Sequence, residues 1–256
     1  MSKYVSVEIA NHIGLVTFSN PPLNFINMDL LSDLVAALKQ LDKNPECRVM
    51  VLASEGKTFC AGADFSSILR EDLDMNEALT LFYNQAMELF DTKKPMIAAV
   101  EGAAIGAGFG LALVADFRVA SPKTTFAANF TKLGIHPGFG MSTTLPRIVG
   151  RNNAELLFYT GRRIKGAIAM QMGLLTELVE GEAVLPTAMI VAAEIATSAP
   201  LAVQTIRATM RQGLAEEVRA INKREQAIQA KQMKTKDFQE GVRASRERRA
   251  PNFTGS

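Results

Sequence analysis

Two short glycine-rich segments have the residue types and spacing that most directly suggest chemistry. They are Ala61-Gly62-Ala63 and Gly106-Ala107-Gly108, and the second directly precedes an apolar stretch typical of a buried helix. Backbone can approach a ligand closely only where side chains are small. Two backbone N–H groups aimed at one carbonyl oxygen, one of them at a helix N-terminus, stabilise negative charge that develops on that oxygen. The alternative is that residues 106–110 only allow a strand and a helix to pack closely.

A few titratable residues lie near these segments or in the loops that follow them. His136 is the default general base by chemistry, although a histidine between Ile135 and Pro137 is often only a packed loop residue. We expect Asp64 and Asp116 to hold their loops through hydrogen bonds. Three further acidic residues either line a ligand pocket as part of a mobile lid or are exposed, and we favour exposure: Glu71, Asp72 and Asp74.

A dinucleotide-binding turn is a second interpretation of the glycines at 106 and 108. They follow a predicted strand and open a predicted helix, as the glycines of that fingerprint do. The sixth position of the fingerprint should be glycine or alanine, but it is Leu111 here. The sequence therefore disfavours a dinucleotide site.

Composition and charge exclude several other classes of protein. The chain has 256 residues and a formal net charge of +2, too close to neutral to indicate nucleic acid as the main partner. Cys47 and Cys60 form no cluster with the two histidines, so we expect buried thiols and no metal site. The N-terminal residues lack the pattern of a secretion signal, and we expect a cytoplasmic protein.

The segment from Met96 to Ala115 is apolar and long enough to resemble a membrane-spanning helix. Glu101 in its middle and the dense glycines that follow argue against that interpretation. A buried strand over 96–100, a glycine-rich turn and a buried helix over about 106–115 explain the segment better. We therefore expect no membrane association.

Hydrophobic periodicity predicts strand–helix units first and helices last. The predicted strands are 5–9, 15–18, 49–53, 96–100, 117–120, 125–127 and 175–179, with a hairpin joining the first two. The predicted helices are 28–42, 77–91, 106–115, 140–149, 151–160, 165–172, 183–198, 200–213, 215–235 and 237–249. This order favours an α/β core over residues 1–198 and a helical region over 199–256 within the same functional unit. Such tail helices often bury their apolar stripe on neighbouring subunits.

Several segments, in this order along the chain, together resemble the crotonase (enoyl-CoA hydratase/isomerase) superfamily. They are Pro22-Leu23-Asn24-Phe25, Phe59-Cys60-Ala61-Gly62-Ala63-Asp64, residues 94–120, Gly134-Ile135-His136-Pro137-Gly138, residues 145–150, and the closing pattern from Thr235 to Phe253. The resemblance covers essentially the whole chain. It implies an α/β fold built as a spiral of ββα units, with a C-terminal helical trimerisation region. It also implies an acyl-CoA thioester as substrate, no separate cofactor, and a homotrimer or a dimer of trimers.

The resemblance also assigns positions in the site. It makes the N–H groups of Ala63 and Ala107 the oxyanion hole for the thioester; the family usually has glycine at 107, and alanine narrows the pocket. It places the CoA adenine against Asn24, Phe25 and the edge of residues 61–64, and Arg248 on the phosphates. Arg248 could equally be a solvated tail charge, because Ser245 replaces the family's phenylalanine nearby. The full set of implied substrate-binding residues is Asn24, Phe25, Ala61, Gly62, Asp64, Phe65, Gly106, Gly110, Phe130 and Arg248.

The chain departs from the family at the residues that perform hydration. Adding water to an enoyl thioester requires two carboxylates that hold the water and move its proton. The family's glutamates correspond to Gly110 and Phe130, and the aspartate of dienoyl isomerases and dehalogenases corresponds to Gly138. None of these residues can transfer a proton.

Two hypotheses from different classes remain open, and weak hydration by a water molecule held by the backbone alone is a third possibility. The first is an acyl-CoA enzyme that stabilises an enolate or oxyanion with non-standard proton donors, as an isomerase, decarboxylase or hydrolase. Its candidate catalytic residues are Ala63, Ala107 and His136. The second is an acyl-CoA binding protein without catalysis, motivated by Gly110 and Phe130 together.

Overall fold

The computed structural model describes residues 2–68 and 74–256, so Glu71 and Asp72 lie outside the described residues. The chain opens with the expected hairpin of β1 (Val5–Ala10) and β2 (Ile13–Phe18). Its two-residue loop consists of Asn11 and His12, whose φ angles of 51° and 66° are both left-handed. Such loops match the twist of the strands they join.

Six strands form the main sheet in the order β1-β2-β3-β4-β6-β9. After the antiparallel hairpin, each neighbouring pair is parallel. The added strands are β3 (Val49–Ser54), β4 (Met96–Val100), β6 (Phe117–Ala120) and β9 (Glu177–Leu178). Parallel neighbours require crossover connections, and the helices supply them.

A second, three-stranded sheet has the order β5-β7-β8. It consists of β5 (Ala103–Ile105), β7 (Thr125–Ala127) and β8 (Arg163–Lys165). The chain therefore moves from the main sheet to the small one between β4 and β5, directly before the glycine-rich turn.

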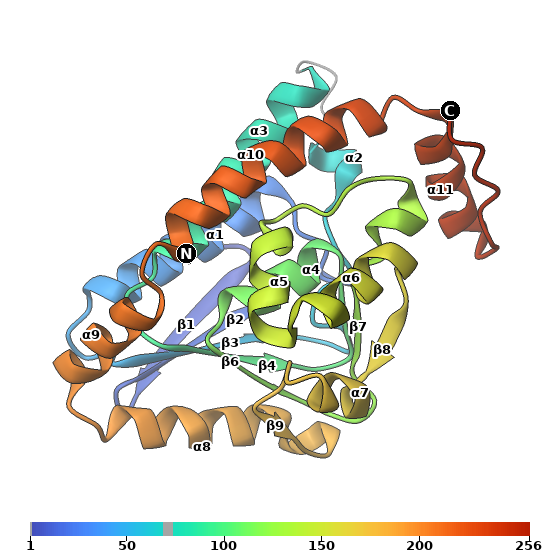
Figure 1. The fold of residues 1–256 in the computed structure, drawn as a ribbon. Helices are drawn as coiled ribbons and strands as arrows, with labels where there is room; N and C mark the ends of the chain where they lie inside the picture. The colour runs from blue at the N-terminus through green and yellow to red at the C-terminus, as the bar shows by residue number, and fades with distance from the viewer. Residues whose placement is uncertain (1, 69–73) are drawn as a thin grey trace.

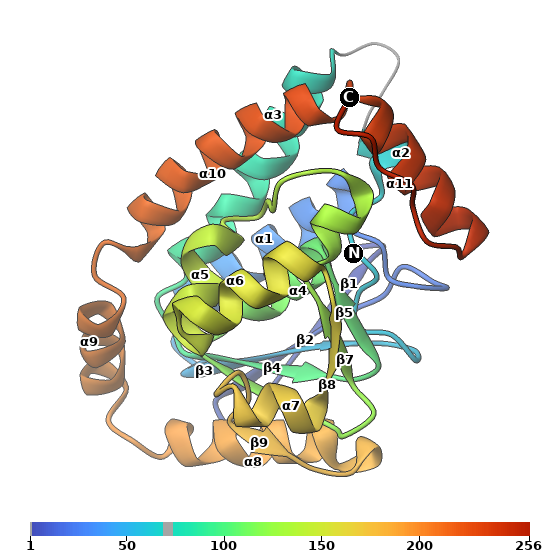
Figure 2. The same cartoon turned by 45° about the vertical axis from the view of Figure 1, so that its right-hand side comes forward.

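Helices cover both faces of the main sheet (Figures 1 and 2). Alternate residues of its strands, such as Val49, Val51 and Ile97, pack against α8 (Val184–Ala196). The intervening residues face the larger core, which includes α1 (Met28–Lys43), α3 (Met75–Met87) and α4 (Ala107–Val114). This two-residue alternation is what a sheet covered on both faces requires.

The second half of the chain is mostly helical. It comprises α5 (Met141–Val149), α6 (Arg151–Thr160), α7 (Gly166–Gln171), α9 (Pro200–Met210), α10 (Leu214–Gln232) and α11 (Lys236–Glu247). The short elements are α2 (Phe65–Ile68) and the 3-10 turns η1 (Glu88–Asp91), η2 (Asn129–Leu133) and η3 (Gly181–Ala183). Helix α10 runs alongside α3 in both views and also contacts α5 (Figures 1 and 2).

Asp116 has the structural role that the sequence predicts. Its carboxylate accepts hydrogen bonds from Arg207 Nε at 2.8 Å and Arg211 Nη1 at 2.9 Å, and from the N–H of Met96 at 2.8 Å. It therefore joins α9 and the residue that follows it to the first residue of β4. Nearby, burial lowers the pKa of Arg118 to about 10, and its guanidinium donates to the carbonyls of Leu174 and Ala115.

The segment 96–115 is confirmed as a strand, a turn and a helix, with the short β5 as an unexpected addition. Within the described residues, no single helix is long and apolar enough to cross a membrane. One pair of helices, Gly181–Ala196 and Pro200–Met210, meets the length and composition criteria together, but it bends by 108°. The boundary between residues 198 and 199 stays a prediction.

Candidate active site

Residues 60–64 run as an extended segment between the loop after β2 and the turn before α4. Ile26 N–H donates to the carbonyl of Gly62 at 2.8 Å, and Asp64 N–H donates to the carbonyl of Ile26 at 2.9 Å. Ala63 lies between these two hydrogen bonds. In a parallel bridge, a residue in that position directs its own N–H away from the partner segment. The N–H of Ala63 therefore points away from Ile26.

The second N–H group is that of Ala107, the first residue of α4. Gly106 precedes it with a φ of 53°, and Gly110 N–H returns to the carbonyl of Gly106 at 3.0 Å. A helix leaves its first N–H groups without intrahelical partners, and these carry the positive end of the helix dipole. Across residues 2–68 and 74–256, neither Ala63 nor Ala107 donates its N–H to any acceptor.

Close backbone approach brings these two segments together. A Cβ at Gly62 would lie 3.4 Å from the carbonyl oxygen of Ile105, and a Cβ at Gly108 would collide with the carbonyl oxygen of Cys60. The glycines at 62 and 108 therefore let the first turn of α4 lie directly against residues 60–62. Cys60 is buried there, and burial raises the pKa of its thiol to about 12, so it is a neutral packing residue at physiological pH.

The three positions that lack the family's carboxylates are filled by aromatic side chains. A Cβ at Gly110 would lie 2.8 Å from Phe139, whose side chain is fully buried. Phe130 itself is 5% exposed. A Cβ at Gly138 would collide with the hydroxyl of Tyr83, which reaches it from α3. These three positions are thus surrounded by buried aromatic side chains, and the tyrosine hydroxyl is the polar group that reaches Gly138.

His136 is partly buried and lies beside a different space. Its Nδ1 is 2.8 Å from the carbonyl oxygen of Pro137. It lines a cavity of about 690 Å³ between α5, α6, α11 and the C-terminal tail, together with Ser142, Arg151 and Tyr159. Neither Ala63 nor Ala107 lines this cavity. The role of His136 as general base stays a prediction.

Asn24 supports the loop in which the CoA adenine is expected. Its Nδ2 donates to the carbonyls of Glu55 at 2.8 Å and Thr58 at 2.7 Å, and its Oδ1 accepts from Asn20 N–H at 2.7 Å. Its amide is therefore committed to the protein. Phe25, which follows it, is 37% exposed and available to a ligand.

Asp64 and Phe65 directly follow the segment 61–63, at which the other side of the nucleotide site is predicted. The Asp64 carboxylate accepts from Ser67 N–H at 3.3 Å, which fits the predicted loop-holding role. Phe65 starts α2 and is partly buried against the core. Contact of either residue with CoA stays a prediction.

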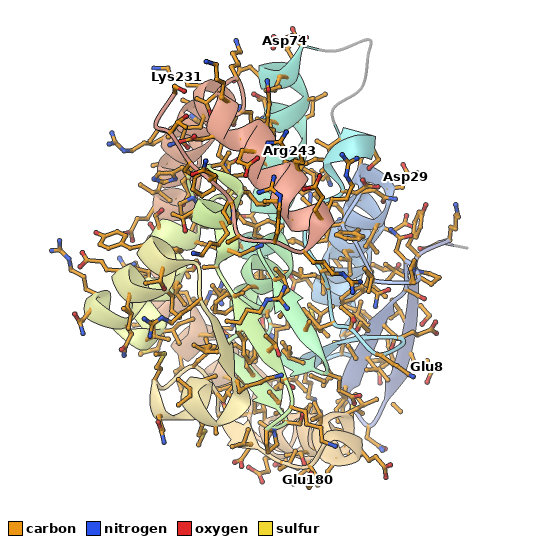
Figure 3. The ribbon with its side chains drawn as sticks, turned by 90° about the vertical axis from the view of Figure 1, so that its right-hand side faces the viewer. Glu8, Asp29, Asp74, Glu180, Lys231 and Arg243 are labelled. Atoms are coloured by element: carbon orange, nitrogen blue, oxygen red, sulfur yellow. The ribbon has the colours of Figure 1, made fainter. Side chains whose placement is uncertain are left out.

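Arg248 lies at the C-terminal end of α11, with a left-handed φ of 56° and an exposed side chain. The tail around it is fixed by Glu240, which accepts from Arg249 Nη1 at 2.6 Å and from Asn252 N–H at 2.9 Å. These partners hold the pKa of Glu240 well below its ordinary value. Other charges of this end, such as Lys231 and Arg243, also lie on the outside of the molecule (Figure 3).

One polar stripe of α10 was not identified from the sequence. Glu225, Gln229 and Gln232 are spaced by four and three residues, so they share a helix face, and all of them bond to the loop 136–142. Glu225 and Gln229 are fully buried, and burial raises the pKa of the Glu225 carboxyl. The spacing of Glu225, Gln229 and Gln232 within the predicted helix 215–235 was the sequence signal for this stripe. Exposed charged helices show the same spacing, so the signal was not specific.

The described residues hold no group of three His, Cys, Asp or Glu side chains that is arranged to bind a metal ion. The site is built from backbone donors and aromatic side chains instead.

Comparison with known proteins identifies the family to which the sequence is similar. A sequence profile described as enoyl-CoA hydratase/isomerase matches residues 8–256. Enoyl-CoA hydratase domain-containing protein 2 of Mus musculus is 35% identical over 240 residues, covering 91% of this chain and 80% of that protein. YngF of Bacillus subtilis, named for the same family, is 32% identical over 248 residues and 95% of both chains.

Solved structures agree with these relatives. An enoyl-CoA hydratase/isomerase from Pseudoalteromonas atlantica superposes with a TM-score of 0.87 at 31% identity, over 98% of this chain and all of that one. An enoyl-CoA hydratase from Mycobacterium avium subsp. paratuberculosis gives a TM-score of 0.87 at 25% identity, over 99% of this chain. The expected crotonase fold is therefore confirmed.

Proposed function

We propose that this chain, which belongs to the enoyl-CoA hydratase/isomerase family, binds an acyl-CoA thioester and stabilises negative charge on its carbonyl oxygen. The donors would be the N–H groups of Ala63 and Ala107. Charge develops on that oxygen whenever the α-carbon loses a proton or a carboxylate, or a nucleophile adds to the carbonyl carbon. Preorganised donors in a dry site stabilise that charge in the transition state.

The observation that carries this proposal is the pair of backbone N–H groups, of Ala63 and Ala107, for which the described part of the chain provides no acceptor. Donors that have no protein partner are costly to bury unless water or a ligand meets them. Their neighbours are small residues, Gly62 and Gly106, which allow a thioester to approach. The exposed Phe25 and Arg248 are the proposed contacts for the nucleotide end of CoA.

We further propose that the reaction is not ordinary hydration. Gly110 and Phe130 replace both glutamates, and Phe139 occupies the space beside Gly110. No carboxylate at these positions holds and deprotonates a water molecule. Isomerisation, decarboxylation, or hydrolysis of a C–C or thioester bond remain the candidate reactions, with a proton donor outside the two glutamate positions.

A second candidate function is binding of acyl-CoA without turnover. Its specific support is the aromatic filling at Gly110, Phe130 and Gly138, because a protein that only binds needs no proton-transfer group at these positions. A panel of acyl-CoA thioesters separates the two functions. Conversion of any thioester supports the enzyme, whereas tight binding with no conversion supports the binding protein. Crotonyl-CoA should keep the absorbance of its conjugated double bond. Loss of that absorbance would show that water has been added and would contradict the proposal that the protein does not hydrate.

Substitution at Ala107 tests the oxyanion hole directly. Ala107→Pro removes the N–H at the first helical position, where proline is tolerated because that N–H has no intrahelical partner. We expect turnover of the active thioester to fall by about 10²–10³-fold, the usual effect of losing one such donor. Ala107→Gly keeps the N–H and is the matched control, which should retain turnover. Equal activity of the two variants would exclude this N–H as a donor.

A further inference from the structure

The side chain of Phe139 packs against Gly110, the position at which the family carries one of its two glutamates. Gly110 lies three residues after Ala107 and therefore about one turn further along the same helix. The β-carbon and ring atoms of Phe139 lie 2.8 Å from the position that a Cβ at Gly110 would take. Phe139 is fully buried, and Phe130 is nearly so. The space beside Gly110, one turn into α4 from the proposed donor, is thus filled by aromatic carbon.

The backbone of Phe139 is held in a conformation that phenylalanine rarely adopts. Its φ is 65°, in the left-handed region, where a side chain with a Cβ is strained. The next residue, Gly140, is also left-handed with a φ of 68°. A strained residue of this kind persists only where the surrounding structure determines it from several sides.

Helix α10 supplies that constraint through the three side chains of its polar stripe, Glu225, Gln229 and Gln232. The two carboxylate oxygens of Glu225 accept from the N–H groups of Gly140 at 2.8 Å and Ser142 at 2.9 Å. These bonds fix the loop directly after Phe139.

The same stripe fixes the loop before Phe139. Gln229 Nε2 donates to the carbonyl of His136 at 2.7 Å, and Gln232 Oε1 accepts from the N–H of His136 at 2.6 Å. Tyr83 completes the arrangement from α3 by donating its hydroxyl to Gln229 Oε1 at 2.7 Å. The loop that carries Phe139 is therefore bound on both sides of this residue.

From this geometry we infer that Phe139, held against Gly110 by α10, limits the length of the acyl group that the site accepts. The inference rests on the proposed binding of acyl-CoA. The native site takes short acyl thioesters, because a longer chain would have to displace a buried ring whose backbone is fixed. Phe139 is the specificity-determining residue, and Glu225 is a positioning residue that acts through it.

The test is a set of dissociation constants for CoA and for acetyl-, butyryl-, hexanoyl- and octanoyl-CoA, measured by calorimetry on the full chain. We expect Phe139→Ala to bind the hexanoyl and octanoyl esters at least about tenfold more tightly than the native protein does, because the vacated space buries additional methylene groups. Affinity for free CoA should not change. Phe90→Ala, which removes another buried phenylalanine from η1, is the control and should keep the native chain-length profile.

Two further variants keep the inference testable if Phe139→Ala folds poorly. Phe139→Leu removes less volume and should shift the profile in the same direction. Glu225→Gln can retain only one of the two carboxylate acceptors, and it should also raise the ratio of octanoyl to butyryl affinity. A purely structural role for Glu225 would instead lower the melting temperature and leave that ratio unchanged.

The outcomes distinguish this inference from the function on which it rests. If the native protein binds no CoA ester, the proposed function fails and this inference fails with it. If the native protein binds short esters but the Phe139 variants keep its chain-length profile, only the inference about Phe139 is overturned. A native preference for long chains would overturn it as well.

Discussion

At the scale of single residues, Gly108 determines how closely the two halves of the site approach each other. A side chain at this position would meet the main-chain carbonyl of Cys60, which cannot rotate away as the end of a flexible side chain would. The missing Cβ therefore allows α4 to lie directly against the segment that carries Ala63. The spacing of the two N–H groups depends on this contact.

Gly108→Ala should separate the two segments and destabilise the protein by about 1–3 kcal/mol, the usual cost of overpacking a well-packed interior. Turnover should fall as well, because the proposed convergence of the two donors on one thioester oxygen would be lost. Urea denaturation measures the first effect. Gly181→Ala is the matched control, because Gly181 has no atom within 4 Å of the added Cβ and no left-handed φ. That control should change the free energy of unfolding by less than about 0.5 kcal/mol, and equal effects of the two substitutions would contradict the explanation.

The same scale shows how far the sequence could predict the site. Gly110 and Phe130 can be identified in the sequence because they occupy positions in an ordered pattern. The side chains that fill the space at Gly110 and Gly138 could not be identified, because Phe139 and Tyr83 reach these glycines from other segments of the chain. The conformation of Phe139 depends on hydrogen bonds from α10, about ninety residues away in the chain. No local pattern contains that information.

At the scale of elements, α10 holds the loop 136–142 partly through the buried carboxylate of Glu225. Burial raises the pKa of Glu225, and the N–H groups of Ser142 and Gly140 partly oppose that effect. Tyr83 and His136 also face this carboxylate, and its charge contributes to the raised pKa of Tyr83. The charged form of Glu225 is therefore less favourable in the folded protein than in the unfolded chain.

The sign of the pH effect follows from this shift. Above the ordinary glutamate pKa of about 4.3, the unfolded chain has released the Glu225 proton while the folded protein still holds it. The contribution of Glu225 to stability is thus fully present below that value and is lost as pH rises through the raised pKa. The quantity to measure is the difference in the free energy of unfolding between the native protein and Glu225→Gln. We expect this difference to decrease as the pH rises from about 4.3 through the raised pKa of Glu225. Glu216→Gln on the exposed part of α10 is the control and should give a flat difference. A flat difference for Glu225→Gln would show that its pKa is not raised.

Helices and strands that a hydrophobic period defines could be predicted from the sequence. Strands that exist only because they pair with a distant strand could not. Helix α1 and strands β3, β4, β6 and β7 lie where the periodicity predicts them. Strands β5 and β8 were not predicted, because each has only three residues and is formed by pairing with β7. The predicted helix 77–91 ends as α3 at Met87 and continues as a 3-10 turn. Sheet membership also depends on long-range pairing, which explains why β6 and β7 belong to different sheets.

At the scale of the whole molecule, α8 and α9 expose several large apolar side chains to solvent, a feature that can mark an interaction surface. The side chains of Ile190, Leu201, Ile206 and Met210 are 60%, 77%, 63% and 77% exposed. Helix α9 stands at the left edge of the molecule in Figure 2, where a short loop joins it to the end of α8, and it lines an apolar cavity of about 500 Å³. We propose that this surface is covered by other copies of the chain, in a homotrimer or a dimer of trimers.

Charges placed on α9 should therefore reduce the mass of the assembly without unfolding the subunit. Leu201 and Met210 make little contact within the chain, so the double substitution Leu201→Glu and Met210→Glu costs little intramolecular packing, whereas it would place carboxylates in an apolar interface. Light scattering after gel filtration should give a multiple of the 27.7 kDa subunit for the native protein and a smaller multiple for the variant. Leu81→Glu, on α3 and 52% exposed, is the matched control and should keep the native mass.

A native protein that elutes as a monomer at all concentrations would contradict the assembly. An unchanged mass for the variant would place the interface elsewhere on the surface.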